Sequence, residues 1–138
     1  MSLNQLYEQY SDQVQFLSIY IREAHPVDGW WLGSGLFGLA LKLGRFNAAT
    51  DVYDPQTLEE RREVAGRCEV ALQYGIPTLV DEMDDAVNKA YAAWPTRLYL
   101  VGLDGRVAYA GGLGPFDFKP AKLGKAIEEY LDQPDGHL

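Results

Sequence analysis

The sequence has little of several features that would indicate a function at once. It has one cysteine, Cys68, so no disulfide can form within the chain, which is typical of a reducing compartment. Acidic residues outnumber basic ones by 20 to 12, which gives a net charge of −8. This charge repels nucleic acids and anionic membranes, so neither is expected as a partner. The longest apolar stretch, 36–43, is far below the roughly 20 residues of a membrane span. With no secretory leader pattern at its start, the chain is predicted to be cytoplasmic.

The apolar content is sufficient for a folded core. Hydrophobic residues make up 47% of the 138 residues, which is the usual size of one domain. We therefore expect a single domain over 1–138. Neither a disulfide nor a metal is needed to hold such a core together, and no motif indicates a cofactor.

Hydrophobic periodicity and turn signals predict alternating helices and strands. Apolar residues at helical spacing open the chain, and a nearly continuous apolar run at 14–21 predicts a buried strand. Thr57 to Glu60 fits a capping box, so a helix is expected to begin there and to end near Tyr74. The remaining pattern predicts, in order, a strand at 76–80, a helix from Asp84 or Asp85 to Trp94, strands at 97–103 and 106–110 joined by a two-residue Asp104-Gly105 turn, and a helix from Pro120.

This order of elements predicts the fold class. A helix, a proline, an antiparallel hairpin and a closing helix form the second half of a thioredoxin-like domain, in which the proline before the hairpin is often cis. Pro95 is that proline here. The prediction is an α/β thioredoxin-like three-layer sandwich with a central mixed sheet.

Three stretches and one loop carry a resemblance to a known family. Residues 20–30 contain Glu-Ala-His-Pro-Val-Asp-Gly-Trp, residues 66–71 contain a helix cysteine, and residues 81–99 contain Met-Asp-Asp, Ala-Tyr and Arg-Leu-Tyr. The hairpin leads into Gly-Gly-Leu-Gly-Pro at 111–115. Together they resemble the iodothyronine deiodinases, most closely the bacterial deiodinase-like group, and the match covers roughly 3–30 and 55–132.

The resemblance implies a thioredoxin-fold oxidoreductase. Its nucleophile would be a selenocysteine or cysteine at the end of the first core strand, and that strand would lie before residue 1, so this chain would lack both. The implied chemistry is reductive dehalogenation or more general thiol and selenol redox chemistry on an aromatic or thiol substrate. The alternative is a non-catalytic thioredoxin-like interaction module, with the apolar segment 31–43 as the contact of a homodimer.

Glu23 and His25 are the first candidate catalytic residues. They stand two positions apart at a strand end, so their side chains share a face. A carboxylate beside an imidazole can act as a proton relay, and the resemblance implies that role. The alternatives are an exposed strand-end pair or a histidine that caps a turn. A zinc site built from these two residues and Asp28 is not expected, because only one histidine and no thiolate stand nearby.

Arg97 and Cys68 complete the candidate set. The resemblance implies that Arg97 faces the cleft and holds an anionic group or a phenolate, while the alternative is a surface salt bridge with Glu23 or Asp81. Cys68 lies on the apolar stripe of its helix, which favours an inert buried thiol. Two alternatives make it a resolving thiol for the absent nucleophile or, less favoured, the nucleophile of a peroxiredoxin-like reductase.

Overall fold

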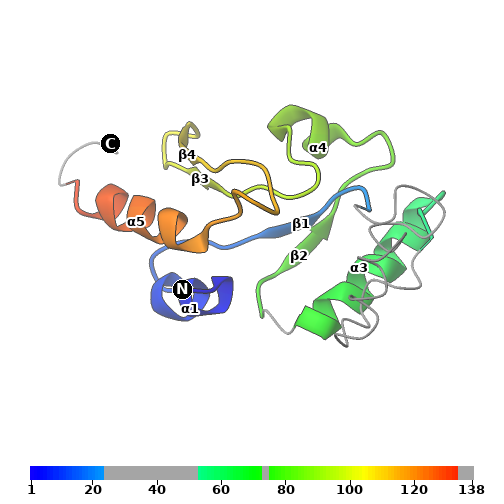
Figure 1. The fold of residues 1–138 in the computed structure, drawn as a ribbon, viewed down its shortest axis with the longest axis horizontal. Helices are drawn as coiled ribbons and strands as arrows, with labels where there is room; N and C mark the ends of the chain where they lie inside the picture. The colour runs from blue at the N-terminus through cyan, green and yellow to red at the C-terminus, as the bar shows by residue number, and fades with distance from the viewer. Residues whose placement is uncertain (24–52, 73–74, 134–138) are drawn as a thin grey trace. The chain divides into compact units, whose positions relative to one another are not determined.

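The computed structural model describes residues 1–23, 53–72 and 75–133, which leaves His25 and the segment 31–43 outside the described residues. The chain divides into two compact units. One combines Met1–Phe16 with Ala93–Leu138 and is called the terminal unit here, and the other, the middle unit, is Leu17–Ala92. The elements are, in order, α1 (Leu3–Tyr10), β1 (Ser18–Tyr20), α3 (Leu58–Leu72), β2 (Thr78–Val80), α4 (Ala86–Tyr91), β3 (Tyr99–Val101), β4 (Val107–Ala110) and α5 (Pro120–Leu131) (Figure 1).

This architecture is mixed α/β, as the sequence predicts. Parallel pairing occurs in the middle unit and antiparallel pairing in the terminal unit, each in a two-stranded sheet. A single three-layer sandwich around one mixed sheet stays a prediction, and so does the single domain over 1–138.

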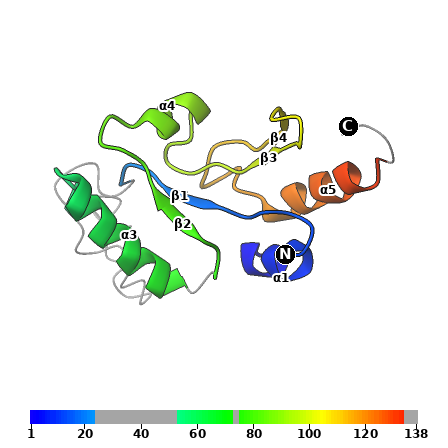
Figure 2. The same ribbon diagram turned by 180° about the vertical axis from the view of Figure 1, so that it is seen from behind.

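In the middle unit, β1 and β2 form a parallel pair beside α3. Ser18 is in register with Thr78, Ile19 with Leu79 and Tyr20 with Val80. Figures 1 and 2 both show α3 running next to this pair. Side chains alternate across a strand, so Ile19 points away from the side taken by Tyr20, and Ile19 and Leu79 are both exposed.

Helix α3 begins with the predicted capping box. The Glu60 amide donates to Thr57 Oγ1 at 3.2 Å, and the Thr57 amide donates to Glu60 Oε2 at 3.2 Å. These reciprocal bonds satisfy amide groups that have no partner inside the helix. The capping-box prediction is therefore confirmed at this helix.

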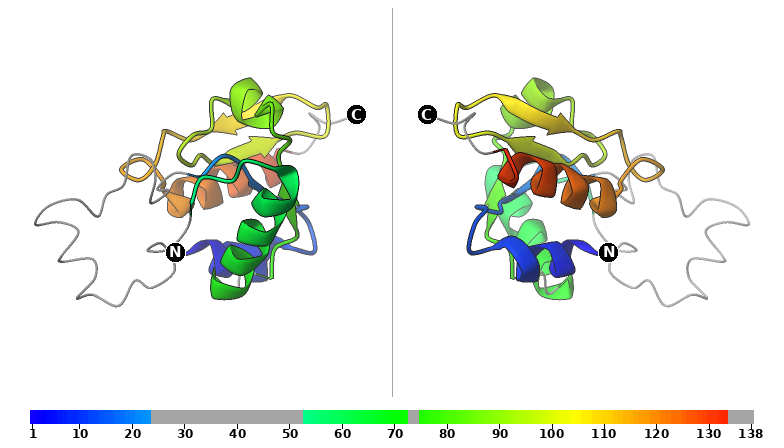
Figure 3. Two further views of the ribbon diagram at one scale, coloured as in Figure 1. Left: turned by 90° about the vertical axis from the view of Figure 1, so that its right-hand side faces the viewer. Right: turned by 90° about the vertical axis from the view of Figure 1, so that its left-hand side faces the viewer.

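The terminal unit is built around the β3–β4 hairpin, with α5 against the hairpin and α1 against α5. Figure 3 shows α5 lying along the hairpin in both views. Five buried side chains from α1, β3 and α5 make its core: Leu6, Tyr10, Leu100, Leu123 and Ile127. The Tyr10 hydroxyl donates to Glu128 Oε1 at 2.8 Å, which gives this core a polar anchor at its edge.

The hairpin turn differs from the predicted two-residue turn. Only Gly105 has a positive φ, at 76°, whereas a type I′ turn would need a positive φ at Asp104 as well. The Gly105 amide donates to the Gly102 carbonyl at 2.9 Å, and the Gly102 amide donates to the Arg106 carbonyl at 2.8 Å. The pairing register also shifts between Leu100 and Val101. The turn is therefore longer than predicted and is followed by a bulged register, so the predicted turn type was wrong.

Two further features bear on the predictions. The Trp94–Pro95 peptide bond is cis, which is the isomer for which the sequence made Pro95 a candidate, and Gly114–Pro115 is also cis. Among the described helices, none is both long and apolar enough to cross a membrane.

Two helical glycines provide a matched test of the packing. A Cβ added at Gly124 in α5 would lie 2.8 Å from Leu6 Cδ2 and 2.9 Å from Met1 Sδ, whereas a Cβ at Gly66 in α3 would meet nothing within 4 Å. We expect Gly124→Ala to destabilise the terminal unit by about 1–3 kcal/mol, because Leu6 is fully buried and has little room to move. Gly66→Ala should instead stabilise the middle unit by about 0.5–1 kcal/mol.

Urea unfolding measures the change in the free energy of unfolding of each variant. Amide hydrogen exchange shows in which of the two units the change occurs. Equal and small changes for the two variants would contradict the packing of α1 against α5 described above.

Candidate functional site

The carboxyl end of β1 carries the first part of the candidate site. Tyr20 is the last residue of β1, and its hydroxyl donates a hydrogen bond to Glu23 Oε2. Burial raises the pKa of the Tyr20 phenol strongly, and the hydrogen bond to Glu23 and the negative charge of Glu23 raise it further. The phenol therefore keeps its proton throughout the physiological range and remains a donor to Glu23.

Cys68 lies on α3, in the same unit as Glu23. The thiol is half-buried. Burial raises the pKa of Cys68, the charge of Glu23 adds to the increase, and Arg67 opposes it. A raised pKa means little thiolate at neutral pH, and the thiolate is the reactive form. This environment favours the predicted inert thiol over an activated nucleophile.

Two of the four predicted site residues, Glu23 and Cys68, lie in the middle unit, where the charge of Glu23 raises the pKa of Cys68. His25 lies outside the described residues. Arg97 belongs to the terminal unit.

Arg97 precedes β3 and is held by its own unit. Its Nε donates to the Gly111 carbonyl at 2.6 Å, and its guanidinium carbon lies 5.3 Å from the centroid of the Tyr99 ring. Gly111 is buried, and a Cβ there would lie 3.1 Å from the Leu98 carbonyl, so this loop runs close to the start of β3. The loop carbonyl and the aromatic face together fix the orientation of the guanidinium.

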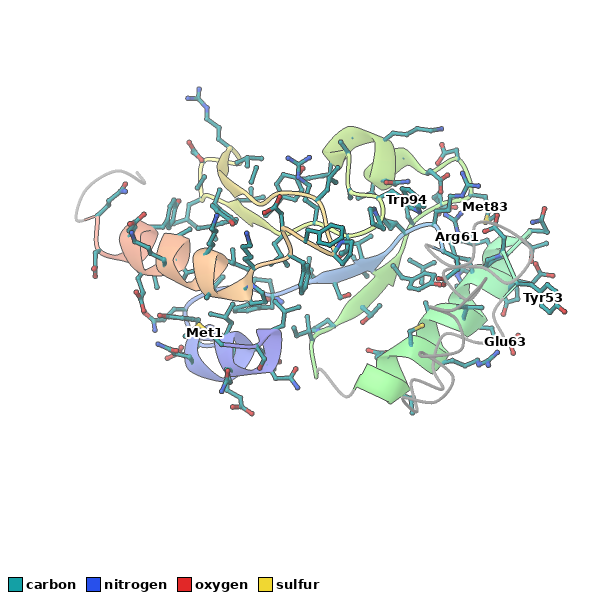
Figure 4. All side chains as sticks on the ribbon, in the orientation of Figure 1. Met1, Tyr53, Arg61, Glu63, Met83 and Trp94 are labelled. Carbon is teal, nitrogen blue, oxygen red and sulfur yellow. The ribbon has the colours of Figure 1, made fainter. Side chains whose placement is uncertain are left out.

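Two buried charged residues lie beside the end of β1; the sequence analysis missed Arg61 and considered Asp81 only as a surface partner of Arg97. Arg61 on α3 and Asp81 directly after β2 are each 3% exposed. Figure 4 shows Arg61 near the carboxyl ends of β1 and β2. The Asp81 amide donates to the Tyr20 carbonyl at 2.8 Å, so Asp81 continues the parallel pairing of the two strands.

A signal for Arg61 was present in the sequence. Arg61 stands three residues after Leu58 and four before Ala65, which places it on the same helical face as the apolar stripe. A charged residue on the apolar face of a helix is expected to be buried, and a buried charge needs a partner of opposite charge. The position of Arg61 therefore indicated a buried ion pair. Tyr20 had a weaker signal, because it stood within an apolar run that predicts only a buried strand.

Among the described residues, no three histidine, cysteine, aspartate or glutamate side chains gather as a metal site. The arrangement at the end of β1 is one of a phenol, a carboxylate and a thiol, with a guanidinium nearby. Such groups can hold, orient and transfer a proton.

Cys68 is the sequence's one cysteine, so a thiol reagent reports on it alone. We expect it to react at pH 7.5 about tenfold or more slowly than a free thiol, because burial raises its pKa and limits access. Glu23→Gln removes the negative charge that raises this pKa further and should accelerate the reaction roughly two- to threefold. Glu69→Gln, at the exposed neighbouring position, is the control and should have no effect. A rate equal to that of a free thiol would contradict the described environment of Cys68.

Comparison with known proteins agrees with the resemblance carried by the motifs. The sequence model of the family described as "Iodothyronine deiodinase" matches residues 1–131. A thyroxine 5-deiodinase of Sparus aurata is 36% identical over 122 residues, which cover 88% of this chain and 40% of that protein. The enzyme of the same name from Aquarana catesbeiana is 34% identical over 128 residues (91% and 41%), and that from Homo sapiens is 31% identical over 140 residues (98% and 40%).

The chain spans about two fifths of the length of these relatives. The matches nevertheless cover nearly all of this chain, and the segments that carry the motifs lie within the matched range. The chain belongs to the iodothyronine deiodinase family.

Proposed function

We propose that this chain supplies the proton-transfer and anion-binding groups of a deiodinase-type reductive reaction. The observation that carries the proposal is the hydrogen-bonded pair of Tyr20 and Glu23 at the end of β1. Membership of the deiodinase family supports the reaction class. The substrate class that follows is an iodinated phenol, since the relatives are named thyroxine 5-deiodinases.

The balance of the reaction defines which groups are needed. Reductive removal of iodine breaks a ring carbon–iodine bond, forms a carbon–hydrogen bond and releases iodide. The ring carbon takes up one proton and two electrons. Two thiol groups supply the electrons as they are oxidised to a disulfide, directly or through an attacking selenol or thiolate. A general acid near the ring and a cation near the phenolate would both accelerate this reaction.

In this proposal Glu23 is the proton-transfer group and Tyr20 orients it. The raised pKa of Tyr20 keeps the phenol protonated, so its hydroxyl holds one carboxylate oxygen of Glu23 in a fixed direction. The carboxylate of Glu23, held in this direction, is the group that would exchange a proton with the reacting group. His25, two residues further along the chain, is proposed as the next group of the relay.

Arg97 is proposed to hold the phenolate or another anionic group of the substrate. Its Nε is bonded to the Gly111 carbonyl, and a guanidinium carries five N–H groups in a planar fork. Such a fork can bind an oxyanion in a defined orientation while the Gly111 carbonyl holds the Nε of Arg97 in place.

Cys68 is not proposed as the attacking group, because its pKa is raised. A thiolate nucleophile needs an environment that lowers the pKa, for example a helix N-terminus or a neighbouring cation. The family resemblance assigns the attack to a selenocysteine or cysteine of another segment. Cys68 stays a candidate for a resolving thiol, which attacks only after the first oxidation step.

Iodide release tests the catalytic proposal. The measurement uses the product of the complete reading frame, with thyroxine as the iodinated phenol and dithiothreitol as the reductant. We expect Glu23→Gln to lower kcat about 100-fold or more, since a positioned proton-transfer group contributes about 10²–10⁴. Glu69→Gln, an exposed carboxylate on α3, is the matched control and should keep kcat within about twofold of the parent, as expected of a distant surface change. Equal activity of the two variants would exclude Glu23 as the proton-transfer group.

Binding of the same phenol tests Arg97 separately. Arg97→Met should weaken binding by about tenfold or more, because it removes a charge-assisted contact worth about 1.5–3 kcal/mol. Arg106→Met, at an exposed arginine in the hairpin turn of the same unit, is the control and should leave binding unchanged. Equal affinity of both variants would show that Arg97 holds no substrate anion and would favour its structural role beside Gly111.

The alternative function, a non-catalytic interaction module, has one observation in its favour. Phe116 is 89% exposed and Leu103 is 83% exposed, both in the terminal unit. Large exposed apolar side chains occur at protein contacts. A complete gene product without iodide release, together with self-association that Phe116→Ser abolishes, would favour this alternative. Sedimentation velocity measures this self-association. Repeating it after substitution of apolar residues within 31–43 tests the proposed homodimer through that segment.

A further inference from the structure

Arg61 is a buried cation that the proposed reaction does not use directly. Removing a guanidinium from water is costly unless its charge and its N–H groups find partners. Here Nη1 lies 3.0 Å from Asp85 Oδ1 and donates to the Glu82 carbonyl at 2.7 Å and to the Asp81 carbonyl at 3.3 Å. All three partners belong to the segment that follows β2. The partners therefore connect α3 to this segment.

The segment that Arg61 holds is a turn with an unusual backbone. Asp85 has φ of 58° and ψ of 39°, the left-handed conformation that few residues other than glycine adopt. Asp85 occupies the N-cap position of α4, yet its side chain caps no helix amide and pairs with Arg61 instead. The ion pair thus stabilises a backbone conformation that is costly on its own.

Asp81 performs the capping from the other side of the turn. Its carboxylate accepts from the amides of Glu82 at 3.0 Å, Val87 at 3.1 Å and Asn88 at 2.9 Å. Three amide donors on one buried carboxylate fix its position closely. The main chain of Asp81 is at the same time bonded to the Tyr20 carbonyl at 2.8 Å. Arg61, Asp81 and Tyr20 are therefore linked through one set of short contacts.

Arg61 also acts on the Tyr20 side chain through space. Its positive charge lowers the pKa of the phenol, against the larger opposing effects of burial and of Glu23. The charge of the guanidinium therefore acts on the phenol, while the guanidinium itself is bonded to the turn after β2. Arg61 affects the main chain of Tyr20 through Asp81 and the hydroxyl of Tyr20 through its charge.

We propose that Arg61 is the positioning residue of the Tyr20–Glu23 pair: its buried guanidinium locks the 81–88 turn against α3, and this lock fixes the end of β1 from which both side chains of the pair extend. The catalytic meaning of this role rests on the proposed function. The positioning itself is a property of the folded chain, and it can be measured without any substrate.

The test compares Arg61→Met with Arg62→Met. Arg62 is the exposed neighbour on α3, where it pairs with Glu59 at 3.7 Å. The ring carbon that bears the Tyr20 hydroxyl (Cζ) is observed by carbon-13 NMR in tyrosine-labelled protein, with Tyr20→Phe to assign the signal. We expect Arg61→Met to shift this signal and to accelerate amide exchange at Asp81, Val87 and Asn88 by about tenfold or more. Arg62→Met should change neither. The amides of Gly102 and Gly111, in the terminal unit, serve as the internal reference.

Two further variants keep the test decisive if Arg61→Met does not fold. Arg61→Lys retains the charge without the planar fork, and Asp85→Asn removes the partner charge while asparagine tolerates the left-handed backbone. Each should accelerate exchange at Val87 and Asn88, and Arg61→Lys should leave the Tyr20 signal closer to that of the parent than Asp85→Asn does. A Tyr20 signal and exchange rates equal to those of Arg62→Met in all folded variants would overturn the proposal. Inactivity of the gene product toward thyroxine would refute the proposed function and leave this result intact.

Discussion

The Tyr20–Glu23 hydrogen bond depends on the parallel pairing of β1 with β2. That pairing sets the register in which Tyr20 faces α3, and the burial that results raises the pKa of the phenol and keeps it a donor. A one-residue slip would turn Tyr20 to the exposed side, where Ile19 now lies, and would separate it from Glu23. The pairing continues one residue beyond the strands through the bond from Asp81 to Tyr20, so the turn after β2 takes part in setting the register.

Charge compensation explains why so acidic a chain buries an arginine at this point. Asp81 and Asp85 bring two carboxylates to the end of β2, and Arg61 is the cation beside them. Asp81 accepts hydrogen bonds from backbone amides and Asp85 forms the ion pair, so the two acids have different partners within one turn. Removing the charge of Arg61 or of Asp85 would leave the other charge of this ion pair without its partner. Such a loss costs more stability than the intact ion pair contributes. The turn is in this sense a single unit.

Local signals in the sequence were reliable where one backbone rule decides the structure. The capping box at Thr57 and the helix that begins at Pro120 are both confirmed, and Pro95, the candidate for a cis bond, has one. Strand lengths were less accurate, because the apolar run at 14–21 continues beyond the three residues that pair, Ser18–Tyr20. The Asp104-Gly105 turn was wrong in type, since the register shift at Leu100 and Val101 and the packing of Tyr130 on Gly102 are set by residues far apart in the sequence.

The candidate site was predictable in part for a similar reason. Glu23 and Cys68 lie in the same unit, and the charge of Glu23 acts on the thiol, but the partner that orients Glu23 is Tyr20, which the apolar pattern assigned only to a strand. Arg61 was missed because a charged residue is expected in solvent, although its spacing from Leu58 and Ala65 put it on the buried stripe. Motifs identify the residues of a family, whereas the partners that tune them follow from packing.

The hydroxyl proton of Tyr20 provides the most direct test of the Tyr20–Glu23 pair. In an equal mixture of light and heavy water, a hydroxyl that exchanges slowly splits the carbon-13 signal of its ring carbon into two lines. The account predicts two lines for Tyr20 in the parent protein and one averaged line in Glu23→Gln, because the hydrogen bond to the carboxylate is what retains the proton. One averaged line in the parent would contradict the pair, and with it the assignment of proton transfer to Glu23.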